Sequence, residues 1–97
     1  MQLRDLSRRE RRQLGILPWQ LTRTTLQLAR DGVDIKRISS DELAQLLMAE
    51  VQADNADAWQ RVRDTVGERD WEEFFAAFAE FIKDIAPVIL EIILMLL

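Results

Sequence analysis

The feature that most constrains the fold of this chain is an apolar stripe at helical spacing in its last third. From residue 71 to residue 85, aromatic and aliphatic residues recur every three or four positions, and the segment after Pro87 is apolar almost all round. This spacing predicts a helix. At 100° per residue, four of its acidic residues lie within about 40° of one another. They form a thin polar line that consists of Glu73, Glu80, Asp84 and Glu91. A surface helix of a monomer has a wider polar face, so something must cover the remaining surface.

Three kinds of neighbour compete to cover this helix: the rest of the chain, a membrane, or another protein chain. The span from Ile85 to Leu97 has 13 residues, or about 20 Å of helix, whereas the hydrocarbon core of a bilayer is about 30 Å thick. A span that begins at Phe74 contains four charged residues, each of which costs about 2.5–3.5 kcal/mol near the bilayer centre. The first two predicted helices offer large apolar residues for one side only. We therefore expect another protein chain to cover the rest, with a membrane as the alternative. The expected interface comprises Trp71, Phe74, Phe75, Phe78, Phe81, Ile82, Ile85, Ile89, Ile92, Ile93 and Leu96.

Helical periodicity is also the only regular pattern of any length in the rest of the chain. The three glycines and two prolines fall where helices are expected to break. We predict helices over residues 2–14, 18–31, 40–67 (with a break or a bend at 54–55) and 70–97. Ser39 and Asp70 are each followed three residues later by glutamate, a pattern typical of a helix N-terminus. The alternation at residues 33–35 is too short for a strand in a sheet, which predicts a connector with apolar anchors.

No long linker and no internal repeat divides the sequence. The 97 residues are therefore predicted to form one all-α domain, a small bundle of four or five helices with a mainly apolar C-terminal helix. Charge does divide it: residues 1–40 carry nine basic and four acidic residues, whereas residues 41–97 carry four basic and 13 acidic residues. Such a split indicates that the two regions attract each other or that the basic region meets an anionic partner.

The candidate site for an anionic partner, either nucleic acid or anionic lipid, is a cluster of arginines near the N-terminus. On a continuous helix they would form a basic ridge suited to phosphates. The ridge consists of Arg4, Arg8, Arg11 and Arg12. No aromatic residue interleaves with them, so a stacking surface for single strands is absent. A solvated helix face, or a set of ion-pair partners for the acidic region, is the plainer interpretation.

The composition removes most catalytic and cofactor chemistry. The chain has no cysteine and no histidine, which excludes thiolate nucleophiles, Ser-His pairs and zinc fingers. Its glycines are isolated, so no phosphate-binding loop exists. Asp54, Asn55 and Asp57 resemble the start of a calcium loop, but the loop glycine is missing and Thr65 stands where a glutamate closes such loops. We therefore predict no enzyme activity, no metal and no cofactor.

The favoured function is that of a structural or assembly protein, which associates through its apolar C-terminal helix with copies of itself or with a larger complex. The alternative is a small membrane-associated protein whose C-terminal helices bundle around a polar path. A third interpretation is a nucleic-acid binder with a basic arm. The arginine-rich start lacks the apolar core of a secretory signal, so the cytoplasm, or the assembly itself, is the expected location.

Overall fold

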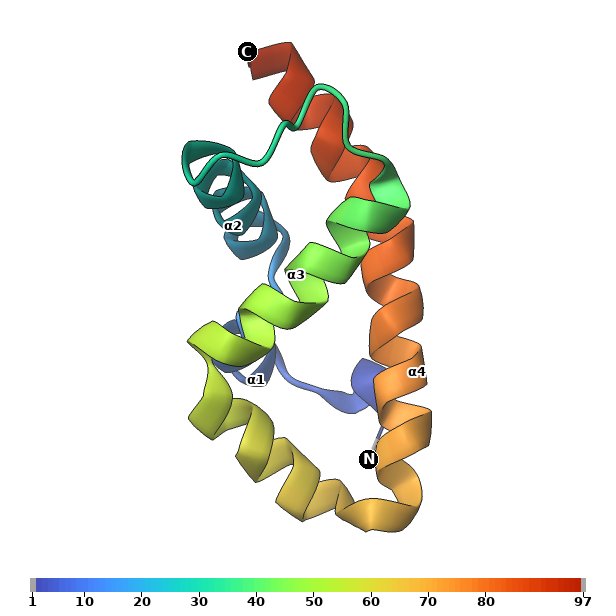
Figure 1. Ribbon diagram of the computed structural model, residues 1–97. Coiled ribbons are helices and arrows are strands. Elements are labelled where there is room, and N and C mark those ends of the chain that lie inside the picture. Colours follow the sequence, from blue (N-terminus) through green and yellow to red (C-terminus); the bar gives the residue numbers. More distant parts are fainter. Residues whose placement is uncertain (1, 97) are drawn as a thin grey trace.

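A computed structural model describes residues 2–96 of the chain, and Figure 1 shows how they are arranged. Over these residues the regular structure is entirely helical, which confirms the predicted all-α class. The elements are the 3₁₀ turn η1 (Leu3–Asp5) and the helices α1 (Arg8–Leu14), α2 (Pro18–Arg30), α3 (Ser40–Asp54) and α4 (Ala56–Leu96). Three long helices carry the fold, slightly fewer than the predicted four or five. The difference arises because α1 has only seven residues and the last predicted helices join in α4.

A bend in α4 lets this helix return along α3. The first part of α4 leads away from the end of α3, and beyond Gly67 the second part runs back past α3 toward the C-terminus (Figure 1). The contact between α3 and α4 is the most extensive between any two elements, and α2 packs on both of them. Both η1 and α1 lie against α4. The resulting molecule measures 40 × 21 × 20 Å.

Glycine and proline set the boundaries of the first two helices, as predicted, whereas Pro87 lies inside α4 and marks no break. Helix α1 ends at Gly15, which has the left-handed torsions φ 79° and ψ 20°. Helix α2 begins at Pro18, because the first turn of a helix does not use the N–H group that proline lacks. At Gly32, which follows α2, two successive N–H groups donate to carbonyls of the last helical turn, a Schellman motif. Residues 33–38 then form turns without a strand, and Ile35 anchors them in the core.

The helix predicted over residues 2–14 is wrong, because Leu6 and Ser7 adopt extended torsions and interrupt it. The Ser7 hydroxyl accepts a hydrogen bond from the N–H of Glu10 at 3.1 Å, and the Glu10 carboxylate accepts one from the N–H of Ser7 at 2.9 Å. This reciprocal capping box starts a new helix at residue 8. Ser39 caps α3 as predicted, since its hydroxyl accepts from the backbone N–H three residues later.

The two remaining breaks lie at Asn55 and Gly67. The predicted break at residues 54–55 is confirmed, and the Asn55 side-chain amide donates to the Val51 carbonyl at 2.9 Å. Gly67 has φ 76° and ψ 166°, which are not helical torsions. The helix start predicted at Asp70 is wrong, because α4 resumes its helical path directly after Gly67. The bend is therefore confined to a single residue.

The hydrophobic core lies where α2 and α3 meet the second part of α4. Its buried residues include Leu6, Leu14, Ile16, Leu21, Leu28, Ile35, Leu43, Ala44, Leu47, Met48, Val51, Trp59, Phe74, Phe78, Ile82, Ala86, Ile89 and Ile93. The buried hydroxyl of Thr25 donates to the Leu21 carbonyl at 2.8 Å. Within residues 2–96 no buried side-chain polar atom lacks a hydrogen-bond partner. The core thus meets the usual requirement for a stable interior.

An aromatic cluster joins the two parts of α4 across the bend. Trp59 in the first part is 4% exposed, and its ring lies 4.6 Å from that of Phe78 in the second part, centroid to centroid. Trp71 meets the same indole edge-on at 6.4 Å, and the Arg63 guanidinium lies 5.4 Å from the centre of the Trp71 ring. The Trp59 Nε1 donates to the Leu14 carbonyl at 3.1 Å. These contacts hold α1 and both parts of α4 together.

Candidate interaction surface

The apolar residues predicted at the interface fall into three groups in the structure. Those buried in the core of the chain itself are Phe74, Phe78, Ile82, Ile89 and Ile93. Those that are half-buried are Trp71, Phe75, Phe81 and Ile85, and those that are exposed are Ile92 and Leu96. The chain's own helices therefore cover one face of α4, and only the remaining surface is free for a partner.

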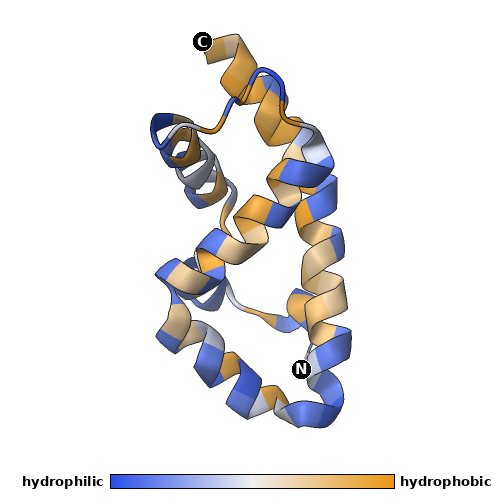
Figure 2. Ribbon diagram, in the orientation of Figure 1, coloured by the Kyte–Doolittle hydropathy of each residue, from blue (hydrophilic) through white to orange (hydrophobic). Residues whose placement is uncertain are grey.

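The last turns of α4 leave several large apolar side chains in solvent. Their exposed fractions are 51% for Val88, 44% for Ile92, 45% for Leu94, 86% for Met95 and 71% for Leu96. We call these five residues the apolar end of α4. Figure 2 shows the hydrophobic colouring of α4 continuing through these turns. Single exposed apolar residues are ordinary on a protein surface, whereas a contiguous group is typical of an interaction surface.

Part of the apolar end continues a regular seam along one flank of α4. The seam consists of Phe81, Ile85, Val88, Ile92 and Met95, which follow one another at spacings of four, three, four and three residues. These residues span about 80° around the helix. Such spacing is typical of helices that pair side by side in coiled coils. This alternating spacing of four and three residues is the sequence signal that identifies Val88 and Met95, which the predicted interface omitted. Leu94, on the other flank, was also omitted and follows no such spacing.

The predicted polar line is exposed along its whole length. Its members are Glu73, Glu80, Asp84 and Glu91. At 100° per residue these carboxylates lie opposite the buried face of α4 and border the seam. Within residues 2–96 none of them forms an ion pair with an arginine, since the salt bridge present joins Arg37 to Asp34 at 3.6 Å on the surface. The polar line therefore faces water in the single chain.

The arginines predicted to form one basic ridge lie on two separate elements. Arg4 belongs to η1, whereas Arg8, Arg11 and Arg12 belong to α1. The Nη2 atom of Arg11 donates to the Leu3 carbonyl at 3.4 Å and so connects the two elements. The other three side chains are exposed. A continuous ridge does not form, because the helix that would carry it is interrupted before Arg8.

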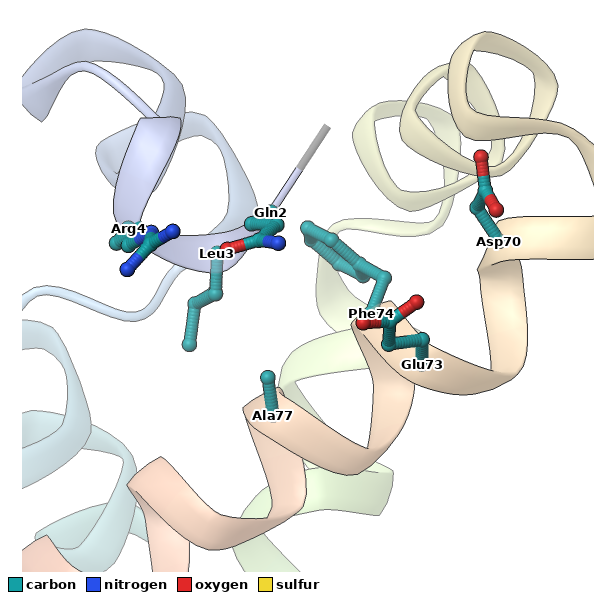
Figure 3. Close-up of a pocket in the computed structure, with 7 residues that line it drawn as sticks. All are labelled: Gln2, Leu3, Arg4, Asp70, Glu73, Phe74 and Ala77. Carbon is teal, nitrogen blue, oxygen red and sulfur yellow. The ribbon is translucent and has the colours of Figure 1, made fainter.

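A pocket of about 510 Å³ lies between η1 and the second part of α4. Figure 3 shows Arg4 on the η1 side of this pocket and Asp70 and Glu73 on the α4 side. Leu3 and Phe74 contribute apolar lining between these charges. Arg4 and Glu73 thus share a pocket without forming an ion pair. Among the described residues, no three or more acidic side chains gather in a way that could hold a metal ion.

Over residues 2–96, no helix combines the length and the hydropathy that a membrane crossing requires. In comparisons with known protein families, curated proteins and solved structures, nothing matches this chain. The exposed surface of α4 is therefore the observation from which a function can be inferred.

Proposed function

We propose that this chain is a non-enzymatic assembly protein, which associates through the apolar end of α4 with copies of itself or with a larger complex. The observation that carries the proposal is the exposure of five large apolar side chains within nine residues, Val88 to Leu96. The same turns also carry Ile89 and Ile93, which are buried in the core. The apolar end is therefore held on a fixed helix, and its position does not depend on a partner.

The size of the apolar end supports weak and reversible association. Its exposed fractions together amount to about three whole side chains, and burial of one such side chain contributes about 1.5–3 kcal/mol. Complete burial would thus supply roughly 5–9 kcal/mol. Loss of translational and rotational freedom on association costs about 4–15 kcal/mol. The balance favours a pairing that requires a high local concentration, or a partner that also covers the half-buried Phe81 and Ile85.

The seam favours a second copy of this helix as the first partner to test. Its spacing of four and three residues is that with which the side chains of paired helices interdigitate. Asp84 and Glu91 border the seam, so they would lie at the edge of a paired interface and not within it. Like charges at that edge weaken the pairing without preventing it, because exposed charge interactions contribute about 0–1 kcal/mol each. This again indicates a reversible assembly.

A membrane surface is the second candidate partner, and one observation favours it. Leu94 lies about 160° from Ile92 around α4, and both side chains are exposed. The last turns thus present apolar groups on more than one side, as does a helix end that inserts between lipid headgroups. The separated arginines offer no comparable observation for nucleic-acid binding.

Sedimentation in detergent-free buffer over a range of protein concentrations tests the proposal. The variant Ile92→Lys/Met95→Lys places two charges on the apolar end. The matched control, Gln13→Lys/Gln45→Lys, adds the same charge at two exposed positions outside the apolar end. Substitution is preferable to removal of residues 88–97, because that segment also contains the buried Ile89. Circular dichroism confirms that each variant keeps its helices.

We expect the wild-type chain and the control to form a discrete oligomer as concentration rises, and the Ile92→Lys/Met95→Lys variant to remain monomeric. A monomer at all concentrations that nevertheless binds phosphatidylcholine vesicles, and loses that binding in the same variant, supports the membrane candidate instead. A wild-type chain that neither associates nor binds vesicles contradicts the proposal. If the variant forms oligomers with the same affinity as the wild-type chain, that result also contradicts the proposal.

A further inference from the structure

Gly67 is the residue at which α4 bends. Its torsions, φ 76° and ψ 166°, interrupt a helix that otherwise runs from Ala56 to Leu96. This region of backbone space is open essentially to glycine only. A Cβ atom added at Gly67 would meet no atom within 4 Å. Only the backbone conformation, and not a lack of space, therefore excludes another residue here.

The bend is also what keeps the second part of α4 on its own chain. Because α4 turns back at Gly67, Phe78 packs on Trp59, and Ile82 and Ile93 become fully buried. If Gly67 took helical torsions, α4 would be one helix of 41 residues, about 60 Å long. The bent molecule is only 40 Å in its longest dimension. A straight α4 would carry its second part out of reach of the α3 in the same chain.

We propose that Gly67 is a hinge through which two copies of this chain exchange residues 68–96. In the exchanged dimer each α4 is straight, and its second part packs on the α3 of the other copy. The partner is therefore a second copy of this chain, because only that copy offers the same complementary surface. All contacts of the buried face, from Phe74 to Ile93, form again between the copies.

Two features of the hinge favour this exchange, and one opposes it. The connection is a single residue with helix on both sides, and so short a connection promotes exchange. A straight helix also gains the backbone hydrogen bonds that the bend interrupts. Against this, Asp64 and Glu68 would stand four residues apart on one face of the straight helix, where like charges repel. Protein concentration then decides between the bent monomer and the exchanged dimer.

This inference rests on the proposed self-association but concerns another surface: the exchange uses the buried face of α4, whereas the proposed function uses its apolar end. The Ile92→Lys/Met95→Lys variant should therefore stay monomeric while it is kept folded, because it lacks association through the apolar end. After unfolding and refolding at high concentration, it should still form the exchanged dimer. The two proposals can accordingly fail independently.

Distances between two spin labels on one chain test the exchange directly. The chain has no cysteine, so labels attach only at the two exposed positions that are changed to cysteine, Asp57→Cys and Glu91→Cys. In the bent chain both Cα atoms lie within a molecule that measures 40 × 21 × 20 Å. In a straight helix they are separated by 34 residues, or about 51 Å. Labelled protein is unfolded, mixed with excess unlabelled protein and refolded, so that each measured distance lies within one chain.

Gly67→Ala is the informative substitution, since alanine disfavours the bent torsions and favours a helix. Gly32→Ala is its matched control, because Gly32 also has a positive φ of 109° and open space around it but lies in the turn after α2. We expect wild-type protein refolded at high concentration to form some dimer with the long distance. Gly67→Ala should raise the fraction of this dimer about tenfold, and Gly32→Ala should leave it unchanged.

A wild-type dimer that shows only the short distance contradicts the exchange. So does the absence of the long distance in both the wild type and Gly67→Ala. If Gly67→Ala fails to fold, refolding of the wild type at low and high concentration still decides the matter. Insertion of two glycines after Gly67 should relax the bend, interrupt a straight helix and return the protein to the monomer. A long distance that persists after this insertion also contradicts the proposal.

Discussion

The hydrogen bond from the Trp59 indole to the Leu14 carbonyl, at 3.1 Å and fully buried, links residues 45 positions apart. Replacement of Trp59 by β-(3-benzothienyl)alanine keeps the shape of the ring and removes its N–H group. The Leu14 carbonyl would then be buried without this donor, which costs about 1–3 kcal/mol. Trp59→Phe adds the loss of part of a ring that packs against Phe78. A chain of this size has a stability of about 5–15 kcal/mol, so the effect is large enough to measure.

Urea unfolding followed by circular dichroism measures the free energy of unfolding for each variant. Trp71→Phe is the matched control, because Trp71 belongs to the same aromatic cluster but is only half-buried, and its indole donates no hydrogen bond to a main-chain carbonyl of residues 2–96. We expect the benzothienyl variant to lose about 1–3 kcal/mol and Trp71→Phe to lose less. An unchanged free energy of unfolding in the benzothienyl variant would refute the reasoning that this bond fastens α1 to α4.

Three further predictions concern a turn, a cap and the apolar end. Gly15→Ala should destabilise the fold by about 1–2 kcal/mol because alanine disfavours the left-handed torsions, and by more because its Cβ would meet the Asn55 side chain. Urea unfolding should show that Asn55→Ala in the same chain recovers this additional loss. If the two substitutions instead destabilise the fold additively, the clash with Asn55 is contradicted. Hydrogen bonds from the Ser7 backbone and side chain lower the pKa of Glu10 from its ordinary 4.5, so the capping box stabilises α1 above that pH and weakens as pH falls through the lower value. In a carboxyl titration by NMR, Ser7→Ala should move this pKa part of the way back, and an unmoved pKa would count against the capping box. Added salt should strengthen association through the apolar end by screening the acidic residues beside the seam; a weakening in sedimentation would indicate that oppositely charged groups hold the assembly together.

Helical class and several helix ends could be predicted from the sequence because they depend on local chemistry. Gly15, Pro18 and Ser39 each act through their own backbone or side chain, and each ends or starts a helix where its residue type predicts. The bend at Gly67 is harder to predict from the sequence. A glycine there indicates a break, but only the packing of Phe78 on Trp59 selects torsions that return the chain on itself.

The candidate surface shows why burial is harder to predict than periodicity. Apolar residues lie almost all round the C-terminal helix, and the sequence alone predicts that the first two helices have too few large side chains to cover it. The cover comes mainly from α3, whose Leu43, Leu47 and Val51 are buried in the common core. Which apolar face of α4 meets α3, and which stays in solvent, depends on how the two helices cross. No spacing within one segment encodes that angle.

Paramagnetic broadening of NMR signals by a nitroxide label tests most directly whether the apolar end of α4 is a docking surface. One sample of the chain carries the nitroxide at Glu91→Cys. A second sample carries no nitroxide but is enriched in ¹⁵N, and the two folded samples are mixed without refolding. Because broadening by a nitroxide detects even weak pairing, it suits the modest affinity that the exposed area supports. We predict that the amide signals of residues 85–96 broaden in the ¹⁵N-labelled copy, and that Ile92→Lys/Met95→Lys in both copies removes the effect. Unchanged signals throughout residues 85–96 at high concentration, or broadening confined to α2, would contradict self-association through this surface.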